Sequence, residues 1–139
     1  MTLIRDPMRL RTVLLLATLT ALILLLLAAC GNPTPRIVVE PTSQDLGERP
    51  QERIELAYTV RNEGDSLLII EKVSTSCACT EAELDRTEIP PGETAQLIVS
   101  LDPVEDDLFG DVKRVIYLRS NDPGAPEVSV EFNVRIIKP

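Results

Sequence analysis

Two different hydrophobic patterns divide this chain. Residues 13–27 form an apolar run interrupted only by Thr18 and Thr20, whereas apolar and polar residues mostly alternate from Ile37 onward. In a strand, every second side chain lies on the same face of the sheet. The second pattern therefore predicts β-strands with one buried face, and the first predicts a separate N-terminal segment.

The expected strands are short and end at turns that contain Pro, Gly, Asn or Asp. They cover residues 37–40, 53–62, 67–73, 95–101, 113–120 and 128–136. Two positions depart from the alternation. Residues 67–70 are all apolar, which predicts a strand that is either covered on both faces or bulged, and Ile98 is an apolar residue on an otherwise polar face.

Many short strands, with no helical spacing after Cys30, predict an all-β fold. The expected architecture is an immunoglobulin-like β-sandwich of seven to eight strands. The chain has no Trp and no widely spaced cysteine pair, so the antibody type of sandwich is not expected. Apolar packing alone must then hold the two sheets together.

The N-terminal segment has the three-part pattern of a bacterial lipoprotein signal peptide. Basic residues from Arg5 to Arg11 precede the apolar run, and the small residues Ala28 and Ala29 precede Cys30. This pattern resembles the lipobox, in which the chain is cleaved before a cysteine whose thiol carries the lipid. Residues 13–29 are fewer than the roughly 20 residues that span a bilayer, which argues against an uncleaved anchor.

This organisation predicts a signal peptide at residues 1–29, the lipidated Cys30 with a short tether to residue 36, and a β-sandwich at residues 37–139. The predicted location is the cell membrane or envelope, with the domain facing outside the cytoplasm. The lipid on Cys30 is the expected membrane contact, and a protein of the envelope is the expected partner.

Charge and composition exclude several classes of function. Without residues 1–29, the chain has 11 basic and 21 acidic residues, for a net charge of −10. Such a protein is repelled by phosphate backbones, so nucleic acid is not expected as a partner. The chain has no His, which removes the commonest general base and metal ligand. We therefore expect no enzyme activity, no catalytic residues and no cofactor.

Cys77 and Cys79 are the strongest candidates for reactive or metal-binding residues in the predicted domain. In an extended strand their Cα atoms would lie about 6.5–7 Å apart, at or beyond the upper limit for a disulfide, so a bridge requires the chain to bend. Four interpretations stay open: a local disulfide, two packed thiols, a redox-active pair, or a Cu(I) site on two thiolates. Zinc is disfavoured because structural zinc sites use four ligands.

Other polar and aromatic positions are weaker candidates. Acidic residues gather at 81–88 and at 102–111, and solvated surface is the expected role of both clusters, ahead of acid–base catalysis at the first or calcium binding at the second. Among the aromatic residues, Tyr58, Tyr117 and Phe132 lie on strand periods and are predicted to be core. Phe109 lies in a loop and is a candidate contact residue.

A series of short strings resembles a known bacterial family. They are Asp45-Leu46-Gly47-Glu48, Tyr58-Thr59-Val60-Arg61-Asn62-Glu63-Gly64, Ser76-Cys77-Ala78-Cys79-Thr80, Ile89-Pro90-Pro91-Gly92-Glu93 and Ser120-Asn121-Asp122-Pro123. Together they resemble the family named domain of unknown function 1573. That family is similar to immunoglobulin-like Hydin-type and major sperm protein domains. The resemblance implies the fold and no particular activity.

The function that these observations predict is a non-enzymatic, membrane-tethered interaction module with an unidentified partner. The alternative is a redox or copper-handling lipoprotein that uses Cys77 and Cys79. A purely structural envelope spacer is the third possibility. The loops after Cys79 and at residues 106–110 are the expected contact surfaces.

Overall fold

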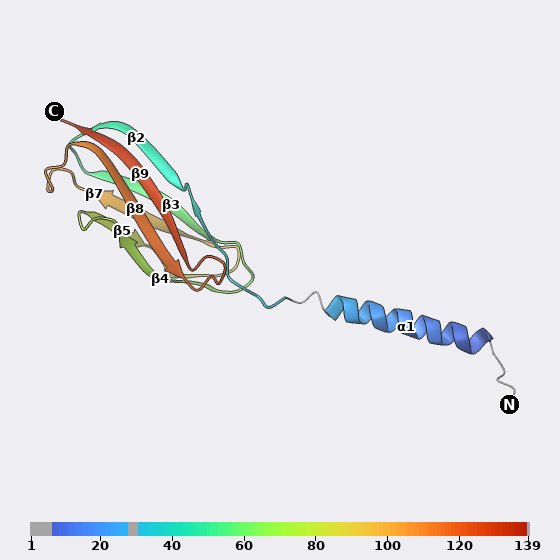
Figure 1. The fold of residues 1–139 in the computed structure, drawn as a ribbon. Helices are drawn as coiled ribbons and strands as arrows, with labels where there is room; N and C mark the ends of the chain where they lie inside the picture. Colours follow the sequence, from blue (N-terminus) through green and yellow to red (C-terminus); the bar gives the residue numbers. More distant parts are fainter. Residues whose placement is uncertain (1–6, 28–30, 139) are drawn as a thin grey trace. The chain divides into compact units, whose positions relative to one another are not determined.

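A computed structural model describes residues 7–27 and 31–138 of the chain. The chain divides into two compact units, Met1–Asn32 and Pro33–Pro139. In the first unit, helix α1 (Pro7–Leu27) contains the apolar run (Figure 1). Cys30, the predicted lipid site, lies outside the described residues. No helix in the described part of the chain is long and apolar enough to cross a membrane.

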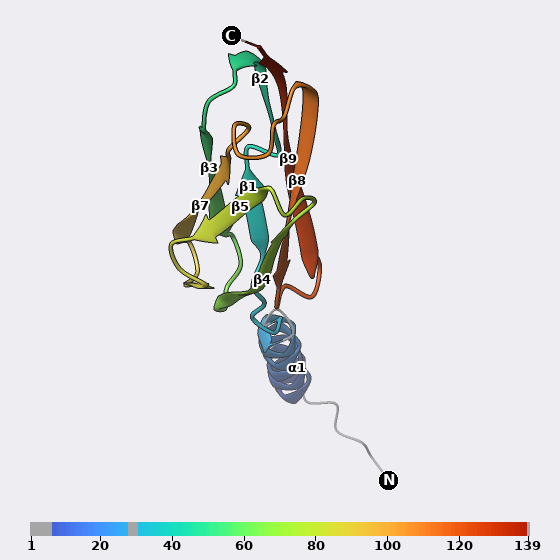
Figure 2. The same cartoon turned by 90° about the vertical axis from the view of Figure 1, so that its left-hand side faces the viewer.

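The second unit is a sandwich of two β-sheets (Figures 1 and 2). The first sheet has the strand order β1 (Ile37–Glu40), β3 (Ile54–Asn62), β7 (Thr94–Leu101) and β5 (Thr80–Leu84). The second sheet has the order β2 (Ser43–Pro50), β9 (Glu127–Ile137), β8 (Gly110–Ser120), β4 (Leu68–Thr75) and β6 (Glu88–Ile89). Neighbouring strands are antiparallel except for β2 and β9, which are parallel.

This architecture confirms the predicted all-β, immunoglobulin-like sandwich. The described residues form nine strands, where the sequence predicts seven to eight. The sequence pattern does not reveal β2, because its polar residues lack apolar alternation and its strand form comes from pairing with β9. The two residues of β6 are too few to show any period.

The core lies between the sheets and follows the alternation of the strands. Tyr58 and Phe132 are fully buried. The sequence pattern predicts Tyr117 to be core, but this side chain is 36% exposed. Ile116 and Leu118, its neighbours on β8, are fully buried, so the side chain between them points to the opposite face of the sheet.

The apolar run at residues 67–70 forms the start of β4 and is not covered on both faces. The register of β4 against β8 shifts between Ile70 and Lys72. Leu67 and Ile69 remain exposed, whereas Leu68 and Ile70 are buried. The bulge follows this run, and burial still alternates along residues 67–70. The sequence shows no alternation there because the exposed residues, Leu67 and Ile69, are also apolar.

The buried Tyr58 is connected to the opposite sheet. Its hydroxyl donates a hydrogen bond to the backbone oxygen of Glu131 at 3.1 Å. Burial raises the pKa of Tyr58 above its ordinary value of 10.0, and the negative charge of Glu131 acts in the same direction. A hydrogen bond with the Gln44 side chain opposes this rise in the pKa.

Candidate functional site

The two cysteines lie in a turn that crosses from one sheet to the other. Residues 76–79 connect β4 of the second sheet to β5 of the first, and Cys77 and Cys79 form a disulfide there. Their Cα atoms are 5.2 Å apart, closer than an extended strand allows, because the chain turns at these residues. The Thr80 N–H donates to the Cys77 carbonyl at 3.2 Å and closes the turn.

The two sulfurs have different surroundings. Cys79 Sγ lies 3.4 Å from Arg114 Nη2, which donates to it, and 3.8 Å from the Thr80 hydroxyl. Cys77 Sγ accepts only the backbone N–H of Cys79, at 3.3 Å, among the interactions of the described residues. One sulfur therefore faces a positive charge and the other faces a neutral amide.

Arg114 reaches the turn from β8 and is incompletely paired. Its Nη1 donates to the Lys113 carbonyl at 2.9 Å, while its buried Nε has no hydrogen-bond partner. Within the described part of the chain, no carboxylate forms an ion pair with it. Sequence reasoning missed this residue, because nothing local on β8 distinguishes it from other strand residues.

A small cavity lies beside Cys79. Its volume is about 190 Å³ and its lining is mostly polar. The lining residues are Arg53, Ala78, Cys79, Glu81, Ser100, Asp102, Glu105 and Asp106. The fold thus brings members of the two predicted acidic clusters to one place. The described residues contain no group of three or more His, Cys, Asp or Glu able to hold a metal ion.

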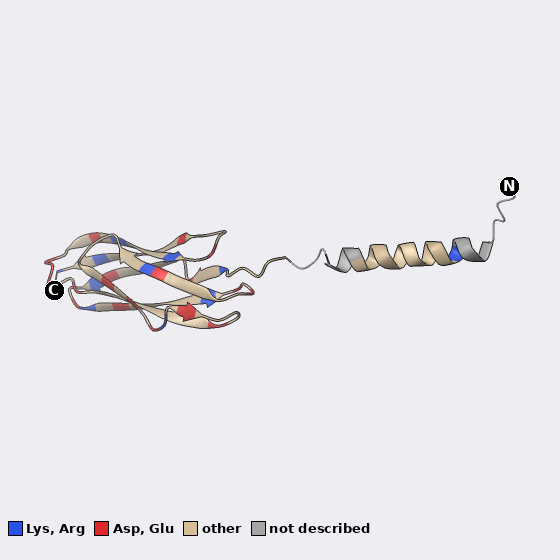
Figure 3. Ribbon diagram, turned by 90° about the horizontal axis from the view of Figure 1, so that it is seen from below, with Lys and Arg blue, Asp and Glu red and all other residues tan. Residues whose placement is uncertain are grey.

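Other members of the acidic clusters lie apart from the cavity lining. Asp85 accepts the backbone N–H of Gln96 at 3.0 Å, and Glu88 belongs to β6 in the second sheet. Figure 3 shows acidic residues along many strands and loops of the domain, with basic residues between them. Phe109, the candidate contact residue, is 36% exposed and has Lys138 Nζ 4.8 Å from its ring centroid.

Strand β5 forms an open edge of the first sheet directly after the cysteine turn. The Asp85 N–H donates to the Gln96 carbonyl at 3.0 Å, and the register continues without a bulge along β5. In an antiparallel ladder, every second residue directs its N–H and C=O toward the neighbouring strand. The backbone groups of Ala82 and Leu84 therefore point away from β7, where the described sheet has no further strand.

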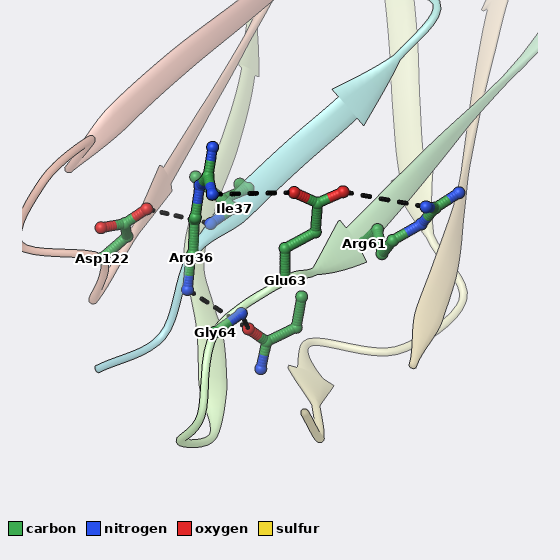
Figure 4. Close-up of polar contacts among 7 residues, drawn as sticks. Arg36, Ile37, Arg61, Glu63, Gly64 and Asp122 are labelled. Atoms are coloured by element: carbon green, nitrogen blue, oxygen red, sulfur yellow. Dashed lines mark hydrogen bonds and ion pairs between the residues drawn. The ribbon is translucent and has the colours of Figure 1, made fainter. Parts of the chain in front are cut away.

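A second polar site holds the start of the domain (Figure 4). Asn62 is fully buried, and its side chain makes four hydrogen bonds. Its Oδ1 accepts the N–H groups of Arg36 and Gly64 at 3.2 and 2.9 Å. Its Nδ2 donates to the carbonyls of Ser66 and Ile89 at 2.7 and 2.9 Å. Every polar atom of this side chain is satisfied.

Asp122 and Gly64 complete this junction. Asp122 Oδ2 accepts the Ile37 N–H at 2.9 Å, in a buried hydrogen bond (Figure 4). A Cβ on Gly64 would lie 2.2 Å from the Thr34 oxygen and 2.5 Å from the Arg36 nitrogen, so the position admits only glycine without movement. Residues 34–36, which the sequence assigns to the tether, are thus held against the domain.

The two packed sheets, with the chain passing from the first to the second between β1 and β2, define an immunoglobulin-like sandwich. The ASH/PapD-like domain 7 of human CEP192 matches it with a TM-score of 0.58 at 10% identity, over 80% of this chain and 92% of that chain. The VesB protease of Vibrio cholerae matches with a TM-score of 0.61 at 14% identity, over 71% of this chain and 31% of that chain.

A protein of unknown function from Porphyromonas gingivalis W83 matches with a TM-score of 0.68 at 27% identity. The match covers 78% of this chain and 50% of that chain, so this chain spans half the length of that protein. The model of DUF1573, described as a protein of unknown function, matches residues 37–135. This chain belongs to the DUF1573 family, which confirms the predicted resemblance. No curated protein matches it.

Proposed function

We propose that this protein is a lipid-anchored, non-enzymatic interaction module outside the cytoplasm, and that it binds an extended, basic segment of a partner protein along β5. The open and unbulged edge of β5, flanked by carboxylates, is the observation that carries the proposal. An extended segment that adds to a sheet edge gains main-chain hydrogen bonds, and side chains on both sides set its specificity.

The other three sheet edges are less suited to this role. On β1, the outward N–H of Ile37 is already taken by Asp122. Strand β6 has two residues, and the part of β4 that extends beyond it begins with a register shift against β8. Strand β2 has a register shift between Asp45 and Glu48 and ends at Pro50, and such interruptions protect an edge from further pairing. Strand β5 has five residues in unbroken register with β7.

Charge favours a basic partner at β5. Glu81 and Glu83 are exposed and alternate with Ala82 along the strand, and Glu105 and Asp106 lie on the adjoining cavity. Arg53 offsets part of this charge, because it lies 3.9 Å from Glu81. Lysine or arginine side chains of an added strand would meet the remaining carboxylates, which raises the association rate and selects the partner.

The anchoring part of the proposal rests on the N-terminal segment. Exposed apolar side chains occupy consecutive positions of α1, from Val13 to Leu16, so they lie on all sides of the helix. Such a segment suits the apolar region of a signal peptide, and the small residues before Cys30 suit lipoprotein processing. Acylation at Cys30 would then hold the domain at the membrane surface.

A titration with a synthetic peptide tests the binding proposal. The probe is an eight-residue peptide of alternating Lys and Val, added to the full chain in detergent. We expect saturable binding that weakens with salt, because the contacts are partly charged. The double substitution Glu81→Gln/Glu83→Gln should weaken binding about fivefold, the size expected for two exposed charge contacts.

The matched control is Glu52→Gln/Glu127→Gln, which removes two exposed carboxylates outside β5 and should leave the affinity unchanged. A second control replaces each Lys of the peptide by Glu and should abolish binding. Equal affinity for the two peptides, or equal loss in the two double variants, would contradict the proposal.

A further inference from the structure

We infer that the Cys77–Cys79 disulfide is a thiol–disulfide exchange site, in which an incoming thiolate attacks Cys77 and Arg114 stabilises the negative charge left on Cys79. This inference goes beyond the proposed docking of a basic segment and does not depend on it. Three features carry it: the small disulfide ring, the unpaired charge of Arg114, and the different surroundings of the two sulfurs.

The disulfide closes a very small ring and therefore contributes little to the stability of the fold. One residue separates Cys77 from Cys79. Closing so short a loop removes little entropy from the unfolded chain, and the gain from a disulfide grows with loop length. Within the described residues, nineteen buried apolar side chains already join the two sheets in one core. The bridge also lies in a turn between two strands, where both cysteines are half-buried and neither is fully enclosed.

Arg114 is a half-buried cation with no anionic partner among the described residues. Its side chain is half-buried, its Nε has no partner, and no carboxylate in the described residues pairs with it. A disulfide sulfur is a weak acceptor for the Nη2 donor 3.4 Å away. A thiolate at Cys79 would supply a full negative charge at the same place. Opening the disulfide therefore relieves an unfavourable burial of charge.

The two sulfurs differ as leaving groups. Cys79 Sγ faces the charged guanidinium and the Thr80 hydroxyl, whereas Cys77 Sγ faces one neutral N–H. Hydrogen bonds from charged donors are about twice as strong as neutral ones. The better stabilised thiolate leaves faster in thiol–disulfide exchange. Attack therefore falls on Cys77, and Cys79 leaves.

The exchange balances with a dithiol as the reductant. A thiolate of the dithiol forms a bond with Cys77 Sγ, the Cys77–Cys79 bond breaks, and its electron pair stays on Cys79 Sγ beside Arg114. The second thiolate of the same dithiol then attacks the dithiol sulfur that is bonded to Cys77 Sγ. This step releases the Cys77 thiolate. The dithiol loses two electrons and becomes a disulfide, the two cysteines gain them, and the thiol protons pass to solvent or to Cys77.

Mapping of the mixed disulfide tests the direction of attack on the unmodified sequence. The full chain in detergent is treated briefly with cysteamine, quenched with acid, alkylated and digested with trypsin. The peptide of residues 73–86 contains Cys77 and Cys79 and excludes Cys30. Fragmentation should place cysteamine on Cys77 and the alkyl group on Cys79. Cysteamine mainly on Cys79, or no adduct at all, would overturn the inference.

Substitution of Arg114 tests its role. In a redox buffer of reduced and oxidised dithiothreitol, Arg114→Gln should shift the equilibrium about tenfold toward the disulfide, which is about 30 mV for two electrons. Arg114→Lys should restore most of the shift. The control is Arg119→Gln, which removes an exposed arginine of the same strand that pairs with Glu71 at 3.9 Å. An unchanged equilibrium in Arg114→Gln, or an equal shift in the control, would contradict the inference.

Discussion

The junction around Asn62 and the turn around Cys79 are both polar sites in an otherwise apolar sandwich, yet they differ in how completely they are paired. All polar atoms of the Asn62 side chain have partners, and Asp122 accepts backbone N–H groups through both oxygens. At the turn, Arg114 has an Nε with no partner among the described residues, and backbone groups of β5 point to a side where the described sheet has no strand.

This difference in pairing distinguishes a polar site that stabilises the fold from a polar site that is a candidate for binding. A buried polar group that is fully paired stabilises one arrangement of the chain and has no free donor or acceptor for a ligand. A group left without a partner costs stability, and an external partner can recover that cost. The first site therefore stabilises the domain, and the second is the site to which our two proposals assign binding of a partner segment and attack by a thiol.

Asn62→Ala should have the largest effect on stability. It leaves the N–H groups of Arg36 and Gly64 and the carbonyls of Ser66 and Ile89 without their partner. We expect a loss of about 3 kcal/mol in the free energy of unfolding, measured by urea denaturation. The control is Asn133→Ala on β9, which should change stability by less than about 0.5 kcal/mol. An equal loss of unfolding free energy in the two variants would contradict the claim that the Asn62 hydrogen bonds stabilise the domain.

Gly64→Ala should come next. The added Cβ would meet the backbone at Thr34 and Arg36 and force residues 34–36 away from the domain. The expected cost is about 2 kcal/mol, as for an overpacked core position, together with faster proteolysis near residue 36. Gly124→Ala serves as the control, because its nearest contact would be an ordinary 3.4 Å. Unchanged proteolysis in Gly64→Ala would argue against this packing.

The double substitution Cys77→Ser/Cys79→Ser should cost less than either junction variant. The loop-entropy relation gives about 1.5 kcal/mol for so short a ring. The same variant should lose all exchange with cysteamine at residues 73–86. A loss of stability larger than that of Asn62→Ala, seen in the same urea experiment, would make the disulfide a structural element and reverse the comparison.

Tyr58→Phe should have the smallest effect at neutral pH, about 1 kcal/mol for the lost hydrogen bond to Glu131. Because the folded pKa of Tyr58 is raised above 10.0, the unfolded chain ionises first as the pH rises. The contribution of this group is therefore complete below pH 10 and is lost above it. The difference in unfolding free energy between the original chain and Tyr58→Phe should shrink above pH 10; a constant difference would contradict the raised pKa.

The sequence could predict the sandwich because burial of one face imposes a period of two, as in β3 and β9. It could not predict β2, whose strand form depends on a partner distant in the sequence. It indicated that a strand ends at residue 62 and did not reveal that the Asn62 side chain is buried. It selected the cysteines by residue type, but the role of Arg114 depends on how β8 packs beside the turn, and no local pattern encodes that.

Amide exchange along β5 tests the central claim most directly, because it observes the open edge residue by residue. The full chain in detergent is examined by NMR with and without the alternating Lys–Val peptide. Without peptide, the amides of Ala82 and Leu84 should exchange faster than those of Glu81 and Glu83, which pair with β7. With peptide, Ala82 and Leu84 should become protected. Protection confined to β2 or β1, or no new protection anywhere, would contradict the assignment of β5 as the binding edge.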